Sequence, residues 1–135
     1  IIFINDNLFE VLAVTGASMQ PTLSPRYRID RTRDFVLWDK FAPTKDLKRG
    51  DIVLFHAPHA PDKLSVKRVV ALGEDTKWDV MFYRNLGRVE VPAGHVWVEG
   101  DNWRKSNDSN AYGPISKNLI LGKARFLVWP LQEFG

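Results

Sequence analysis

The sequence contains no cysteine, so the chain can form no disulfide, no thiolate metal site and no cysteine nucleophile. It also lacks a long hydrophobic run. A membrane-spanning helix needs about 20 apolar residues, whereas the longest apolar stretches, Ile1–Ile4 and Phe126–Leu131, are far shorter. The three histidines lack the helical spacing typical of a zinc site. The chain is therefore expected neither to span a membrane by itself nor to hold a metal.

What the chain does contain is an ordinary globular composition. Its 135 residues suit one domain with its own hydrophobic core. Hydrophobic residues make up 44% and charged residues 26%, which argues against a disordered chain. The net charge of +3 is spread over interleaved acids and bases, so a solvated basic surface is a simpler interpretation than a nucleic-acid or membrane patch.

Proline and glycine are scattered along the sequence and predict a mainly β fold. They leave no uninterrupted helical pattern of about 12 residues, while short β-branched and aromatic runs alternate with turn residues. The proline-rich segment Ala57–Asp62 is expected to be a loop, and residues 75–90 a hairpin excursion. The predicted strands are 8–15, 34–38, 51–56, 64–72, 80–83, 88–91, 95–99 and 121–129.

Ser18 is the candidate nucleophile, because it ends an apolar run and is followed by a turn that contains Pro21. A short helix is expected over Ser18–Leu23, with Pro21 at a tolerated early position. Such a helix aims backbone N–H groups at the surroundings of the serine, where an oxyanion needs donors. The serine lies in Thr15-Gly16-Ala17-Ser18-Met19, so it is not in a Gly-x-Ser-x-Gly elbow.

Lys67 is the candidate base for this serine. A lysine accepts a proton only when it is neutral, which requires burial that lowers its pKa by several units. Lys67 lies in an apolar run, Val66–Leu72, and strand alternation turns it away from its neighbour Arg68. The pattern alone leaves open a second interpretation, a solvated lysine at the edge of a sheet.

The segment Gly100–Asn110 is rich in side chains that hydrogen-bond to their own backbone, and it predicts a rigid loop. Within it, the Ser106 hydroxyl is placed to orient the Lys67 amine. Asp108 is expected to fasten the loop through a charged partner such as Arg68.

Four segments in this order and spacing resemble the type I signal peptidase family: Gly16–Leu23, Arg49–Val53, Lys67–Leu72, and Gly100–Asn102 with Ser106–Ser109. The resemblance extends from about Val11 to Pro130. It implies a signal-peptidase-like β-rich fold of short antiparallel strands, with a short helix after the nucleophile and one catalytic domain over residues 1–135. It also implies a peptidase that needs no metal or cofactor.

The resemblance assigns roles by motif position. Ser18 corresponds to the nucleophile, Lys67 to the general base and Ser106 to the hydroxyl that orients the lysine, while Asp108 and Arg68 give structural support.

Many bacterial members supply an oxyanion hydroxyl where this chain has Gly16, so the backbone N–H of Ser18 is the expected donor. The substrate is expected to lie extended between the strands that lead to Ser18 and Lys67. A shallow pocket for the residue before the cut is assigned to Val14, Met19, Leu23 and Val66, which are also ordinary candidates for the core.

Two segments, Val91–Asp101 and Asp108–Ile115, look like the mitochondrial inner membrane protease branch of the family. This resemblance implies an endopeptidase that removes sorting signals on the intermembrane-space side and forms a heterodimer with a homologous catalytic subunit 1. Its substrate is an extended segment of a precursor protein, and it contacts the membrane through a segment missing from this chain. Residues 1–7 fit either the remnant of that anchor or a plain first strand.

Three other functions fit parts of the pattern. One is a self-cleaving repressor-type domain with a similar Ser/Lys pair, although no DNA-binding helical module precedes Ser18. Another is a basic β-domain whose five tryptophans and three tyrosines stack single-stranded bases. The third is a non-catalytic scaffold subunit of the protease complex. The favoured interpretation involves no nucleic acid.

Overall fold

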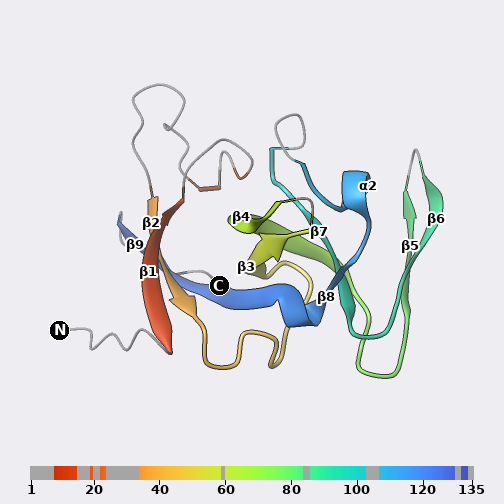
Figure 1. The fold of residues 1–135 in the computed structure, drawn as a ribbon, viewed down its shortest axis with the longest axis horizontal. Coiled ribbons are helices and arrows are strands. Elements are labelled where there is room, and N and C mark those ends of the chain that lie inside the picture. Colours follow the sequence, from red (N-terminus) through yellow and green to blue (C-terminus); the bar gives the residue numbers. More distant parts are fainter. Residues whose placement is uncertain are drawn as a thin grey trace.

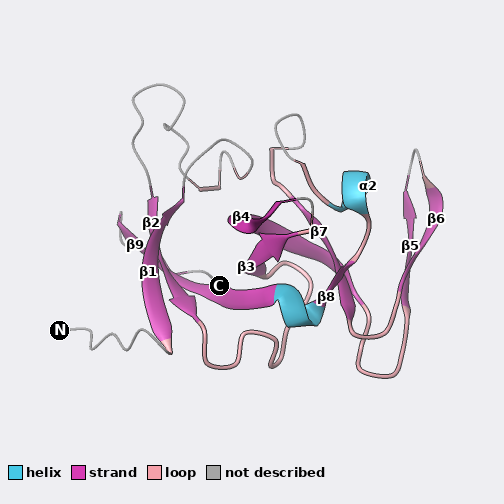
Figure 2. Ribbon diagram, in the orientation of Figure 1, coloured by secondary structure: helices cyan, strands magenta, loops and turns pink. Residues whose placement is uncertain are grey.

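The computed structural model describes residues 8–14, 19, 22–23, 34–58, 60–83, 86–102, 107–129 and 132–133, with side chains omitted for 126–129 and 132–133. These residues form a mainly β structure, as predicted (Figures 1 and 2). The strands are β1 (Phe9–Val14), β2 (Asp34–Asp39), β3 (Ile52–Ala57), β4 (Ala60–Leu72), β5 (Asp79–Tyr83), β6 (Gly87–Val91), β7 (His95–Glu99), β8 (Ile115–Ser116), β9 (Ile120–Trp129) and β10 (Gln132–Glu133). The helical elements are α2 (Ser109–Tyr112) and the 3-10 turn η2 (Lys117–Leu119).

The described strands form an eight-stranded sheet in the order β1-β2-β9-β3-β4-β7-β8, with β10 paired to β9. All of its pairings are antiparallel, which confirms the expected short antiparallel strands. Half of the predicted helix Ser18–Leu23, residues 18, 20 and 21, lies outside the described residues. Its described end forms a turn in which the Leu23 N–H donates to the Met19 carbonyl over 2.9 Å, the spacing of a helical hydrogen bond.

The prediction of a loop over Ala57–Asp62 is wrong at both ends, because β3 extends to Ala57 and β4 begins at Ala60. Ala57 pairs with Ala60, and the next pair is His56 with Leu64, so the intervening residues form an irregularity in the ladder. A proline has no N–H to donate and is tolerated at such a bulge. Pro61 therefore lies inside the strand without disrupting it. The two-residue strands β8 and β10 were not predicted.

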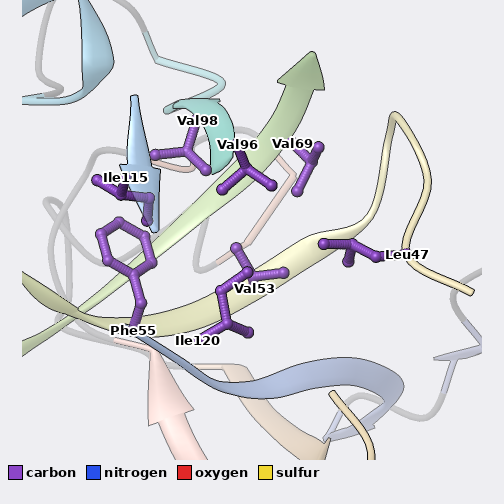
Figure 3. Close-up of a cluster of buried hydrophobic side chains, with 8 residues drawn as sticks. All are labelled: Leu47, Val53, Phe55, Val69, Val96, Val98, Ile115 and Ile120. Carbon is purple, nitrogen blue, oxygen red and sulfur yellow. The ribbon is translucent and has the colours of Figure 1, made fainter. Parts of the chain in front are cut away.

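Strand β3 carries the core on both of its faces. Val53 and Phe55 point into one cluster, whereas Ile52 and Leu54 point into another, as strand alternation requires. Figure 3 shows the first cluster, in which β3, β4, β7, β8 and β9 each contribute buried side chains. Its members are Leu47, Val53, Phe55, Val69, Val96, Val98, Ile115 and Ile120. The second contains Val14, Met19, Leu23, Val36, Trp38, Ile52 and Leu54.

Strands β5 and β6 form a separate two-stranded sheet that stands beside β7 at one end of the molecule (Figure 1). Its inner face packs through Met81 and Val89 against the buried Trp97 of β7. The Tyr83 hydroxyl and the Trp97 indole N–H both donate to the Glu99 carboxylate, the latter over 2.8 Å. The Tyr83–Glu99 hydrogen bond thus joins this sheet to the main one, while the Trp97 bond to the same carboxylate lies within β7.

In the part of the chain that the structure describes, no helix is long and apolar enough to cross a membrane.

Candidate active site

Lys67 is buried, with only 6% of its surface exposed. Its strand lies between β3 and β7, and Lys67 pairs in register with Val53 of β3. Burial lowers the pKa of Lys67 from its ordinary value of 10.5, while the nearby charge of Asp108 acts in the opposite direction. The interpretation of Lys67 as a solvated lysine at a sheet edge is therefore wrong.

A cavity of about 260 Å³ opens beside Lys67. Most of its lining comes from β1 and β4, with one residue each from β2 and β3. Strands β2, β9 and β3 separate β1 from β4 in the hydrogen-bonded order. The sheet must curl to bring them together. The lining residues are Leu12, Ala13, Val14, Trp38, Leu54, Leu64, Ser65, Val66 and Lys67.

Two of the four residues assigned to the substrate pocket, Val14 and Val66, line this cavity. The other two, Met19 and Leu23, are fully buried in the core cluster that also contains Val14. They are not among the residues that line the cavity. Met19 and Leu23 thus hold the segment that follows Ser18 against the core.

Three residues of the predicted machinery, Ser18, Gly16 and Ser106, lie outside the described residues. Their roles stay predictions. The described residues around the first two are informative, because Val14 precedes them in β1 and Met19 follows Ser18 directly. Both of these neighbours are buried, so the chain is fixed on each side of the predicted nucleophile.

Arg68 binds Asp101 rather than Asp108, which corrects the expected pairing. Its Nε donates to Asp101 Oδ1 over 2.9 Å and its Nη2 to Oδ2 over 2.8 Å, and its Nη1 donates to the Gly50 carbonyl over 2.8 Å. The hydrogen bond with Asp101 raises the pKa of Arg68 above its ordinary value, and burial opposes this shift. The guanidinium is thus held in a planar, two-point ion pair.

Asp108 instead acts as the N-cap of α2. Its Oδ1 accepts from the backbone N–H of Asn110 over 3.0 Å, and its Oδ2 accepts from that of Gly100 over 3.1 Å. The neighbouring Ser109 hydroxyl accepts from the Val98 N–H over 2.9 Å. These contacts fasten α2 to the end of β7 and keep a carboxylate close enough to affect the pKa of Lys67.

Sequence reasoning assigned no role to Asp101 and Thr22. The Thr22 hydroxyl donates to Asp101 Oδ2 over 2.5 Å, so this carboxylate receives hydrogen bonds from two distant segments. Burial raises the pKa of Asp101, but the hydrogen bonds from Arg68 and Thr22 and the charge of Arg68 hold it below its ordinary value. The only signal in the sequence was the motif Gly100-Asp101-Asn102, which does not reveal its partners.

The structure describes His56 and His95, and neither is among the residues that line the cavity beside Lys67. The His95 Nδ1 lies 3.0 Å from the Ala93 carbonyl, and His59 lies outside the described residues. The same region contains no group of three or more His, Cys, Asp or Glu side chains that are placed to hold a metal ion.

Comparison with known proteins gives the family of this chain. The family model described as signal peptidase, peptidase S26, matches residues 1–80 and 76–129. The chain belongs to this family of signal peptidases. The match supports a signal-peptidase-type protease and confirms the resemblance drawn from the four sequence segments.

The more similar relatives narrow this class. Mitochondrial inner membrane protease subunit 2 of Saccharomyces cerevisiae is 46% identical over 98% of this chain and 75% of its own length. The protein of the same name from Schizosaccharomyces pombe is 36% identical over 100% of this chain and 73% of its own. Human mitochondrial inner membrane protease subunit 1 is 37% identical over 93% of this chain and 72% of its own length. The segments Val91–Asp101 and Asp108–Ile115 look like subunit 2 in particular, and the two fungal relatives confirm that resemblance.

Proposed function

We propose that this chain is the catalytic domain of a membrane-associated serine endopeptidase with a Ser18/Lys67 dyad. It removes sorting or signal peptides from proteins delivered to the mitochondrial intermembrane space. The observation that carries the proposal is the burial of Lys67 beside the cavity between β1 and β4, because burial lowers its pKa. A lysine that is neutral near physiological pH can accept the proton of a serine hydroxyl.

The reaction divides into two halves. In the first, Ser18 Oγ attacks the substrate carbonyl, Lys67 Nζ takes the hydroxyl proton, and the same proton then passes to the leaving amine. The backbone N–H of Ser18 donates to the oxyanion, since Gly16 offers no hydroxyl. In the second half, Lys67 takes a proton from water as the water oxygen attacks the acyl ester. It returns that proton to Ser18 Oγ as the ester bond breaks and the carboxylic acid product leaves. Ser106 orients the lysine amine throughout.

The substrate binds as an extended strand between β1 and β4. Two features of the sheet support this. Among the described strands, β1 stands at one end of the hydrogen-bonded order. Strand β7 pairs with β4 only from Arg68 to Leu72, so residues 64–67 have β3 on one side and no described strand on the other. Val14 and Val66 then face the residue before the cut.

The enzyme works at the mitochondrial inner membrane, with its catalytic domain facing the intermembrane space, and pairs with a homologous catalytic subunit 1. The names of the relatives support the membrane and the subunit organisation, since proteins named subunit 1 and subunit 2 both match this chain. A segment missing from this chain provides the contact with the membrane.

Single and double substitutions test the dyad. The full-length protein is assayed on a precursor peptide together with a subunit 1 that lacks its own catalytic serine, so that any turnover comes from this chain. Ser18→Ala and Lys67→Ala should each remove nearly all cleavage, and the double variant little more, because the two residues act as a unit. Lys63→Ala, which changes an exposed lysine on the same strand, is the matched control. Substantial turnover by the Lys67→Ala enzyme would overturn the mechanism.

A further inference from the structure

Three segments that are far apart in the sequence meet at the Asp101 carboxylate. Asp101 itself follows β7, Arg68 comes from β4 and Thr22 comes from the turn that includes Met19 and Leu23. Both carboxylate oxygens bind Arg68, and Oδ2 also accepts the Thr22 hydroxyl. We refer to the three residues Thr22, Asp101 and Arg68 as the clamp.

The clamp connects the two halves of the proposed dyad. Thr22 lies one helical turn after Ser18 in the sequence, and Arg68 is the residue next to Lys67. Fixing Thr22 relative to Arg68 therefore restricts the distance between the nucleophile segment and the base strand. We propose that Thr22 is a positioning residue, whose hydroxyl sets the placement of Ser18 relative to Lys67 through Asp101.

Core packing by itself does not fix the position of Ser18 relative to Lys67. Met19 and Leu23 are buried among apolar side chains, and such contacts are not directional. A hydrogen bond to an ionised carboxylate is short and directional, and here the carboxylate is already held at two points by a guanidinium. The Leu23 N–H donates to the Met19 carbonyl, so the residue next to Thr22 is bonded to the residue that follows Ser18.

The inference rests on the proposed Ser18/Lys67 mechanism, and three variants test it. Thr22→Val keeps the shape of the side chain and removes the hydroxyl, whereas Thr22→Ser keeps the hydroxyl. Thr76→Val makes the same chemical change at an exposed threonine that has no side-chain hydrogen bond among the described residues. Each full-length variant is assayed with its partner subunit for kcat and KM on a precursor peptide, and its amide hydrogen exchange is measured at Leu23.

We expect Thr22→Val to lower kcat about 10- to 100-fold, because small displacements of catalytic groups have effects of this size. KM should change little, since the cavity residues are untouched. Exchange at the Leu23 amide should become faster. Thr22→Ser should restore most of kcat and the slow exchange, and Thr76→Val should resemble the wild type.

Two results would overturn the role of Thr22. One is equal behaviour of Thr22→Val and Thr22→Ser in kcat and in Leu23 exchange. The other is a uniform acceleration of exchange across the core strands, which indicates a general loss of stability rather than a local one. A fully active Ser18→Ala enzyme would instead refute the dyad, while Leu23 exchange would still report whether the Thr22 hydroxyl holds this turn.

Discussion

Lys67 and Arg68 are neighbouring basic residues on one strand, but their surroundings differ and shift their pKa values in opposite directions. Lys67 is buried, and burial lowers its pKa. Arg68 faces a carboxylate that binds it at two points, and its pKa is raised. Strand alternation places the two side chains on opposite faces of β4. The surroundings of each side chain, in addition to its residue type, thus decide its role. Burial suits Lys67 to proton transfer, and the facing carboxylate suits Arg68 to a structural ion pair.

The comparison has consequences for stability at different pH values. The pKa of Lys67 is lower in the folded chain than its ordinary 10.5, so the unfolded chain binds more protons below that pH. Stability linked to Lys67 therefore rises as the pH is raised toward 10.5. The pKa of Asp101 is held below its ordinary 3.8, so its contribution is present above 3.8 and is lost as the pH falls through the lower folded value.

The largest effect is expected for Lys67→Met, which removes the buried cation of the pair Lys67 and Arg68. Cleavage should fall by at least about 10³-fold, because the base is gone. Stability at pH 7 should rise by about 1–2 kcal/mol, because folding buries Lys67 at a cost that is seen in its lowered pKa, and a methionine side chain carries no such cost. Urea unfolding measures this difference, and it should shrink as the pH approaches 10.5. A variant less stable than the wild type at pH 7 would contradict the burial argument.

An intermediate effect is expected for Asp101→Asn, which removes the charged partner of Arg68. Loss of the charged, two-point contact should cost about 1–2 kcal/mol in urea unfolding at pH 7. The matched control is Glu10→Gln, which affects the Lys40–Glu10 pair with its single 2.9 Å contact. That more exposed pair should contribute less than about 0.5 kcal/mol. If both substitutions had equal effects, the clamp would be no stronger than a surface ion pair.

Several features of this comparison follow from the sequence. The apolar run around Lys67 predicted a strand in which this lysine is either buried or solvated at a sheet edge, and alternation predicted that Arg68 would face elsewhere. The partner of Arg68 could not be predicted, because a loop has no period that distinguishes Asp101 from Asp108. The choice depends on the register of β4 and β7, which places Arg68 opposite Glu99 and so two residues from Asp101.

Contacts over long sequence separations were also beyond prediction. Thr22 and Asp101 are 79 residues apart, and no local pattern links a turn threonine to a loop carboxylate. The strands β8 and β10 have two residues each, which is too short for any alternation to appear. Pro61 argued for a loop, but an irregularity in the β3–β4 ladder accommodates it within the strand.

The smallest effect is expected for Asp108→Asn. This variant distinguishes the effect of the Asp108 carboxylate on Lys67 from the effect of the Asp101 carboxylate on Arg68. Asp108 raises the pKa of Lys67 against the effect of burial, so removing its charge should lower that pKa further. Asparagine still caps a helix, and its amide oxygen keeps the bond to the Asn110 N–H, whereas its NH2 group cannot accept from the Gly100 N–H and that bond is lost. The rate of acylation rises as Lys67 loses its proton, so the rising part of the pH profile should move to lower pH.

Asp101→Asn is the control for this shift, since the charge of Asp101 is paired with Arg68 and not with Lys67. It should lower the maximal acylation rate through the clamp and leave the position of the rising part unchanged. The measurement is the rate of acylation against pH for the wild type and both variants. An equal shift in the two variants would mean that general negative charge, rather than the placement of Asp108 near Lys67, controls the protonation of the base.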